Sequence, residues 1–357
     1  MKSALLILMS VTGMTSAVFA DVPAKTAPQV LVMGRVAKGP DGWRATWPGT
    51  MLAVRFEGRA VGVELNDEQS GYVAEIDGGI TRNIDPASGV RTVWMRDLPK
   101  GPHVLRLIRR NETPEAPGTV RRFLIEKGKW LAAPASSRRQ IEFIGDSWTA
   151  AFGNTSKGRE CTPEEIRDRT DASQSFGVQV ARHYGAGWQL NAYSGMGMVR
   201  NWNGTHPERD FCTFYPRLLQ NDPASRADDP RWKPQLIVIG LGTNDFSTPV
   251  APGQKWTRET LAKEYKSAYK EFIASLRKRD RNATIILTAA YLSPDDPLRP
   301  LVKQIVDEER AAGDRRISYL PWEGLQLDGC LWHPSLDDHR RMADELIHAI
   351  DGMKIFP

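Results

Sequence analysis

The first third of the chain alternates apolar and polar residues with a period of two. Runs such as MLAVRFEG, AVGVELND, YVAEIDGG and HVLRLIRR show this alternation between residues 21 and 137, with Gly, Asp or Asn close to their ends. Such alternation is typical of strands that bury one face. The pattern predicts an antiparallel β-sandwich domain over residues 21–137.

The pattern changes after residue 138. Buried strands are indicated by IEFIG, WQLNAY, QLIVIG, ATIILTAA and RISYL, and helical periodicity over residues 173–184, 257–280, 298–312 and 334–350. Strands that alternate with helices predict a parallel sheet covered by helices on both faces. We therefore expect an α/β domain over residues 138–357, with its ligand site at the carboxyl ends of the strands.

The amino terminus has the features of a secretory signal. Residues 1–20 contain a positive charge at Lys2, the apolar run ALLILMSV and a small-residue cleavage site ending at Ala20. A membrane anchor is the alternative, but the run is shorter than the roughly 20 residues that a span needs. We expect export to the periplasm or the medium, and no membrane contact of the mature chain.

Charge and cysteine content narrow the expected partners. The 357 residues carry a net charge of +5, but basic runs such as RLIRRNE are interrupted, so we expect a solvated surface and no nucleic-acid partner. We also expect a monomer. An exported chain with three cysteines can form one internal disulfide, and the loop positions favour Cys161–Cys212 over pairings with Cys330. No cysteine or histidine spacing predicts a metal site.

Four short blocks follow predicted strands or precede the last helix. They place Ser147 in GDS, Gly195 in YSGMGM, Asn244 in GLGTNDFS and His333 in DGCLWHPS. Each block alone is compatible with an ordinary turn. Because loops at the carboxyl edge of one parallel sheet lie close together, we expect the four residues to converge.

The residue types suit acyl transfer. A serine hydroxyl needs a base to act as a nucleophile at neutral pH, and a histidine supplies one. Glycine allows a backbone N–H to approach a substrate, and an asparagine amide can donate to an oxyanion. We expect the neighbouring acids Asp146 and Asp245 to stabilise their own turns.

These blocks, in this order, resemble the SGNH hydrolases. The resemblance is closest to carbohydrate esterase family two, in which a jelly-roll-like sandwich precedes the SGNH domain, and WPGTMLAVRFEG, LPKGPHVLRLIRRNE, IEFIGDS and WHPS carry it. It implies Ser147 as nucleophile, His333 as base, and an oxyanion hole made by the backbone N–H groups of Ser147 and Gly195 with the Asn244 amide. It also implies deacetylation of sugars such as those of acetylated xylan, with no cofactor.

One position departs from the SGNH pattern. Many members have an aspartate three residues before the histidine, where this chain has Cys330. Family-two members are known to use a Ser–His dyad whose histidine is oriented by a backbone carbonyl. Asp328 would complete a triad if its loop folded back, so dyad and triad both stay open.

Substrate contacts and rival functions rest on fewer residues. Trp332 and Trp148 adjoin the base and the nucleophile, so each is a candidate for substrate binding, with core packing as the alternative. A lipid esterase or thioesterase on the same scaffold is a second hypothesis. A carbohydrate-binding protein with an inactive SGNH domain is a third.

Overall fold

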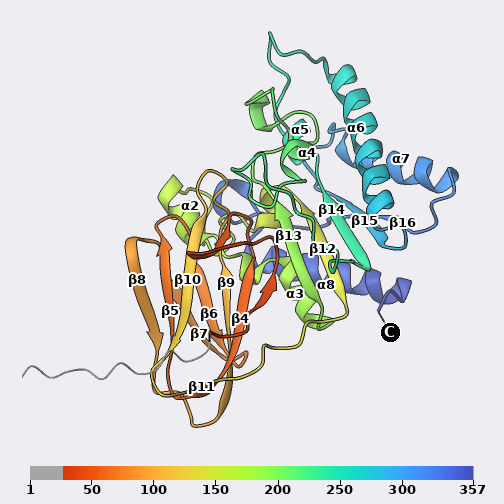
Figure 1. Ribbon diagram of the computed structural model, residues 1–357. Helices are drawn as coiled ribbons and strands as arrows, with labels where there is room; N and C mark the ends of the chain where they lie inside the picture. The colour runs from red at the N-terminus through yellow and green to blue at the C-terminus, as the bar shows by residue number, and fades with distance from the viewer. Residues whose placement is uncertain (1–26, 357) are drawn as a thin grey trace, which may run out of the picture.

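The computed structural model describes residues 27–356, which form two domains lying side by side (Figure 1). The predicted signal peptide lies outside the described residues. Among residues 27–356, no helix combines the length and apolar character needed to cross a bilayer.

The amino-terminal domain is a sandwich of two antiparallel sheets, as predicted. One sheet has the order β1-β4-β9-β6-β7 with β11 beside β4, and the other has the order β2-β3-β10-β5-β8. The strands are β1 (Leu31–Met33), β2 (Ala37–Gly39), β3 (Gly42–Ala45), β4 (Met51–Gly58), β5 (Val61–Asp67), β6 (Tyr72–Ile76), β7 (Ile80–Ile84), β8 (Ala87–Met95), β9 (Pro102–Arg109), β10 (Gly118–Ile125) and β11 (Gly128–Trp130). The four runs read from the sequence correspond to β4, β5, β6 and β9.

Strand β4 connects the cores of the two domains. Successive side chains of a strand point to opposite faces. Accordingly, Val54 and Phe56 pack in the core between the two sandwich sheets, whereas Met51 and Ala53 pack in the core shared with the second domain. Strand β4 is therefore buried on both faces over most of its length, and the domains pack against each other there.

The second domain has a five-stranded parallel sheet of order β13-β12-β14-β15-β16. Its strands are β12 (Gln140–Gly145), β13 (Gly187–Ala192), β14 (Leu236–Gly240), β15 (Thr284–Ala289) and β16 (Ile317–Pro321). All five confirm the predicted strands. The strand order reverses at β12, and ligands of open parallel sheets bind near such a switch point.

The four predicted helices are present and cover both faces of this sheet (Figure 1). They are α3 (Phe176–His183), α6 (Arg258–Arg279), α7 (Leu298–Ala311) and α8 (Leu336–Met353). Shorter helices are α1 (Ser147–Ala150), α2 (Pro163–Arg169), α4 (Phe211–Phe214), α5 (Thr243–Phe246), η1 (Ala172–Gln174), η2 (Trp202–Gly204) and η3 (Cys330–Trp332). A capping box at Ser335 starts α8 two residues after His333.

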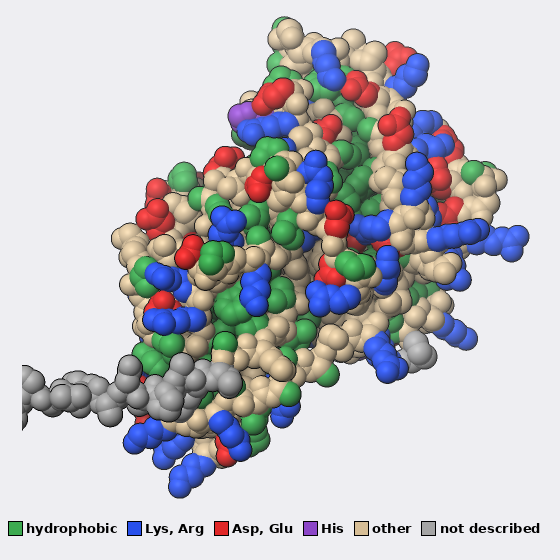
Figure 2. Space-filling model, viewed as in Figure 1, with side chains coloured by type: hydrophobic (Ala, Val, Ile, Leu, Met, Phe, Trp, Pro, Cys, Tyr) green, Lys and Arg blue, Asp and Glu red, His purple; other side chains and the backbone are tan. Residues whose placement is uncertain are grey.

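The exposed face of α6 and α7 carries charges of both signs. Figure 2 shows Lys and Arg side chains interspersed with Asp and Glu over this part of the surface. Glu308 of α7, for example, pairs with Lys266 and Lys270 of α6 at 2.8 and 3.0 Å. The mixed charges match the interrupted runs seen in the sequence.

Candidate active site

Strand register brings three of the four blocks to one edge of the parallel sheet. Gly145, the last residue of β12, is aligned with Ala192 of β13 and with Gly240 of β14. The chain therefore leaves all three strands at the same level, just before Ser147, Gly195 and Asn244. The three loops thus leave the sheet at one edge, as expected from the order of strands and loops.

Ser147 and His333 are in direct contact. The Ser147 Oγ lies 2.8 Å from Nε2 of His333. The other ring nitrogen, Nδ1, lies 2.9 Å from the carbonyl oxygen of Cys330 and 3.1 Å from that of Leu331. Because a carbonyl oxygen only accepts hydrogen bonds, Nδ1 carries the proton and Nε2 presents a lone pair to the serine hydroxyl. This is the tautomer that a general base requires.

The environment of His333 favours its neutral form. Burial lowers the pKa of the imidazole below its usual value of 6.5, and the two carbonyl contacts oppose this effect. The Phe152 ring packs against the imidazole with 4.5 Å between centroids and contributes to the burial. The ring is therefore an unprotonated base at neutral pH.

Three groups with donor capacity lie at this edge of the sheet. Ser147 is the first residue of α1, so its N–H has no partner within the helix. Gly195 has φ +79°, and a Cβ built on it would meet no atom within 4 Å, so open space adjoins its backbone. Asn244 Nδ2 donates a 2.9 Å hydrogen bond to the Met196 carbonyl and a longer one, 3.4 Å, to Asp146 Oδ2. The loop that carries Gly195 thus also orients Asn244.

Asp146 and Asp245 support the site in different ways. Asp146 accepts a 3.1 Å hydrogen bond from Trp148 N, as expected for a residue that stabilises its own turn, and burial raises its pKa to about 7. For Asp245 the expectation is wrong. Its carboxylate accepts three 2.9 Å bonds from the N–H groups of residues 198, 199 and 200. The sheet edge places it against that neighbouring loop, which follows Gly195.

The sandwich contributes Glu112, the last residue of the run LPKGPHVLRLIRRNE, which was not predicted as a site residue. Both carboxylate oxygens of Glu112 accept from the backbone N–H of Ser194, at 3.0 and 3.2 Å. Burial raises the pKa of Glu112 to about 7. A cavity of about 530 Å³ lies at this domain boundary, and Glu112, Ser194 and Phe152 are among its lining residues. The sandwich therefore reaches the residue next to Gly195.

The structure places Asp328 away from the imidazole. Its Oδ1 accepts a 2.8 Å hydrogen bond from Arg159 Nη2, and its side chain is 60% exposed. The acceptors at Nδ1 of His333 are instead the carbonyls of Cys330 and Leu331.

The expected disulfide between Cys161 and Cys212 is wrong. Cys161 is bonded to Cys330, with 5.5 Å between their Cα atoms, whereas Cys212 is a free thiol whose Sγ lies 3.6 Å from Met198 Sδ. The physical reason is the path of the loop that precedes α2. It folds over the loop that leads to His333, and so it carries Cys161 to a residue that follows 169 positions later.

Comparisons with known proteins agree with this geometry in both domains. Residues 32–134 match the family described as carbohydrate esterase 2 N-terminal. Residues 143–349 match the GDSL-like lipase/acylhydrolase family. The chain belongs to carbohydrate esterase family 2. It is therefore a carbohydrate esterase with an SGNH-type α/β domain.

Relatives cover nearly the whole of this esterase. It is 34% identical to an acetylxylan esterase/glucomannan deacetylase of Cellvibrio japonicus over 348 residues, which is 96% of this chain and 95% of the relative. A family-two carbohydrate esterase of Clostridium thermocellum, solved with cellohexaose, has a TM-score of 0.81 at 29% identity and covers 92% of this chain and 100% of its own. A carbohydrate esterase whose active site has catalytic and non-catalytic binding functions has a TM-score of 0.84 at 33% identity, covering 92% and 98%.

The two candidate tryptophans of the esterase differ in exposure. Trp148 is 8% exposed and packs within the core of the α/β domain. Trp332 is 62% exposed, next to His333, with the Arg159 guanidinium 3.6 Å from its ring centroid. Trp332 is thus the one of the two that a bound sugar ring can reach.

Proposed function

We propose that this esterase removes O-acetyl groups from plant polysaccharides such as acetylated xylan, through an acyl-enzyme formed on Ser147 with His333 as the base. The observation that carries the proposal is the 2.8 Å contact between Ser147 Oγ and a histidine nitrogen whose lone pair is fixed by its tautomer. The relative from Cellvibrio japonicus is named an acetylxylan esterase/glucomannan deacetylase, which supports this substrate class.

In the proposed reaction, Ser147 Oγ attacks the acetyl carbonyl while its proton passes to Nε2 of His333. The oxyanion receives hydrogen bonds from the N–H groups of Ser147 and Gly195 and from the Asn244 amide, which exchanges its long 3.4 Å bond to Asp146 Oδ2 for this one. The imidazolium then protonates the departing sugar oxygen. Water, deprotonated by the same nitrogen, attacks the acetyl carbonyl. The bond to Ser147 Oγ then breaks, the imidazolium returns its proton to that oxygen, and acetate leaves.

Trp332 is our candidate for sugar binding. Its exposed ring lies one residue from the base and offers a flat apolar surface to a pyranose. The buried position of Trp148 supports a packing role for that residue instead. We also propose that the chain is exported, because its first 20 residues have the features of a signal peptide. Amino-terminal sequencing of the mature protein should then begin at Asp21.

Acetate release from acetylated xylan and from an acetylated monosaccharide tests the activity. Ser147→Ala and His333→Ala should each lower kcat by at least about 10³-fold, because nucleophile and base act as one unit. The matched control is His348→Ala, which removes an exposed histidine of α8. Wild-type rates in Ser147→Ala would refute the nucleophile. Preference for long-chain over acetyl esters would favour a lipid esterase, and sugar binding without acetate release would favour a binding protein.

A further inference from the structure

The carbonyls that orient His333 belong to an unusual piece of backbone. Leu331 and Trp332 have φ values of +51° and +62°, and these two residues separate Cys330 from His333. Residues other than glycine seldom occupy this left-handed region, and they stay there only where the surrounding structure holds them. The acceptors of Nδ1, the carbonyls of Cys330 and Leu331, lie within this strained turn.

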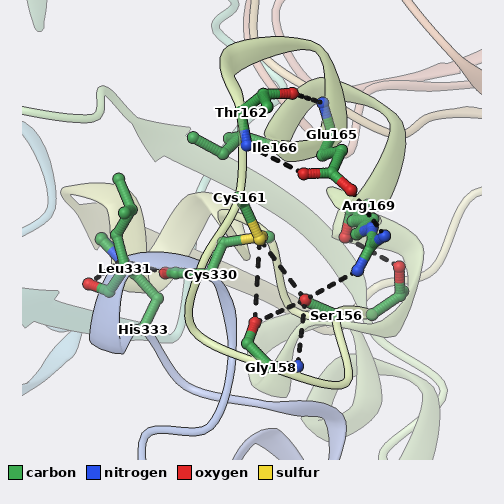
Figure 3. The surroundings of a disulfide bond; sticks show 12 residues. Ser156, Gly158, Cys161, Thr162, Glu165, Ile166, Arg169, Cys330, Leu331 and His333 are labelled. Atoms are coloured by element: carbon green, nitrogen blue, oxygen red, sulfur yellow. Dashed lines mark hydrogen bonds and ion pairs between the residues drawn. A yellow bond between two sulfur atoms is a disulfide. The ribbon is translucent and has the colours of Figure 1, made fainter.

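The loop of residues 153–161 packs against the turn of residues 330–333 and is bonded to it. Cys161 is bonded to Cys330, and Figure 3 shows this disulfide joining the two loops beside His333. Two backbone bonds accompany it, from Cys330 N to Gly153 O at 3.3 Å and from Leu331 N to Arg159 O at 2.7 Å. The cross-link is attached to the residue whose carbonyl accepts the imidazole proton.

The Arg159 side chain also binds the segment just before this turn, at residues 326 and 327. Its Nε donates to Leu327 O at 2.9 Å, and its Nη2 donates to Gln326 O at 2.8 Å. The guanidinium also stacks on Trp332. These bonds fix the start of the turn, whereas the disulfide fixes the residue at which the orienting carbonyls begin.

We propose that the Cys161–Cys330 disulfide positions the catalytic base, by holding the carbonyls of Cys330 and Leu331 against Nδ1 of His333 where many SGNH hydrolases have an aspartate. The inference rests on the proposed Ser147–His333 dyad. Without the cross-link, residues 331 and 332 relax towards negative φ, and both carbonyls turn away from the ring. Cys161 and Cys330 are then positioning residues, and their loss affects turnover more than substrate binding.

The test begins with single cysteine variants and 4-nitrophenyl acetate hydrolysis. Cys161→Ser should lower kcat by at least about 10-fold with little change in KM, yet by less than the ~10⁴-fold expected for complete loss of an orienting group. Cys212→Ser, which leaves the disulfide intact, is the matched control and should keep wild-type kinetics. Near-ultraviolet circular dichroism confirms that each variant is folded at the assay temperature.

A pair of double variants separates orientation from stability. Cys161→Ser with Cys330→Asp and Cys161→Ser with Cys330→Asn both lack the cross-link and differ only in a carboxylate or an amide. The aspartate variant should exceed the asparagine variant in kcat by at least about 10-fold, because a carboxylate orients the ring and stabilises the imidazolium. Its acidic limb of kcat/KM should also move to higher pH.

Two results would overturn the inference. One is a folded Cys161→Ser variant with wild-type kcat while Ser147→Ala is inactive. The other is a slow Cys161→Ser variant that the aspartate does not rescue, which would assign the loss to the fold of the loop. Persisting activity in Ser147→Ala would instead refute the proposed function, so the two failures are distinguishable.

Discussion

Replacing Asp328 by asparagine distinguishes a dyad from a triad most directly. The Asp328 carboxylate pairs with Arg159 at 2.8 Å, with the two side chains 60% and 35% exposed. Surface pairs of this kind contribute about 0–1 kcal/mol. Arg159 keeps its bonds to the carbonyls of Leu327 and Gln326 in the variant. We therefore expect the free energy of unfolding to fall by less than about 1 kcal/mol.

Activity should change equally little in this variant. The imidazole is oriented by the carbonyls of Cys330 and Leu331, so the turnover rate for acetate release should stay within about threefold of wild type, the equivalent of less than 1 kcal/mol. If Asp328 were the triad acid, its amide variant would lose about 10⁴-fold in turnover by favouring the wrong tautomer. The two expectations differ by more than three orders of magnitude.

The measurement compares initial rates of acetate release and urea unfolding for wild type and Asp328→Asn. The matched control is Asp307→Asn, which removes a comparable exposed pair with Lys303 on α7, remote from the site. A roughly hundredfold loss of turnover in Asp328→Asn, equivalent to about 3 kcal/mol, with Asp307→Asn unchanged, would refute the dyad.

Four further outcomes are expected. In denaturant without reductant, alkylation followed by mass spectrometry should modify Cys212 alone, and two more thiols after reduction. Gly153→Ala should cost about 2 kcal/mol or more in urea unfolding, because its Cβ would lie 2.4 Å from Cys330 Cβ at φ +59°. Glu112→Ala should lower kcat roughly fivefold, the equivalent of one hydrogen bond of about 1 kcal/mol next to Gly195. The acidic limb of kcat/KM should lie below pH 6.5, because burial lowers the pKa of His333 and keeps it unprotonated as the pH falls. A midpoint above 6.5 would contradict that reasoning.

Features that depend on local periodicity were predictable from the sequence. The five parallel strands and the four long helices each have a continuous apolar pattern, and chain order then places Ser147, Gly195 and Asn244 at one sheet edge. The capping box of Thr162 and Glu165 at the start of α2 is also visible in the sequence. The apolar periodicity alone did not predict this short helix.

Features that depend on contacts between distant segments were not predictable in this way. The disulfide partner of Cys161 follows 169 residues later, and position in a loop after a strand does not specify which loop folds over it. Glu112 belongs to the other domain, and its role appears only when the sandwich packs against Ser194. Asp245 likewise accepts hydrogen bonds from the neighbouring loop and not from its own, because adjacent strands bring the two loops together at the sheet edge.

The acceptor at Nδ1 has an electrostatic consequence for the base. A carbonyl oxygen carries only a partial charge, so it fixes the tautomer of His333 but stabilises the imidazolium less than a carboxylate does. Desolvation consequently dominates, and the pKa of the ring is lowered. A neutral acceptor also exerts a weaker orienting force, so the turn that presents it must be rigid. The left-handed residues Leu331 and Trp332 supply the geometry of that turn, and the Cys330 cross-link supplies its rigidity.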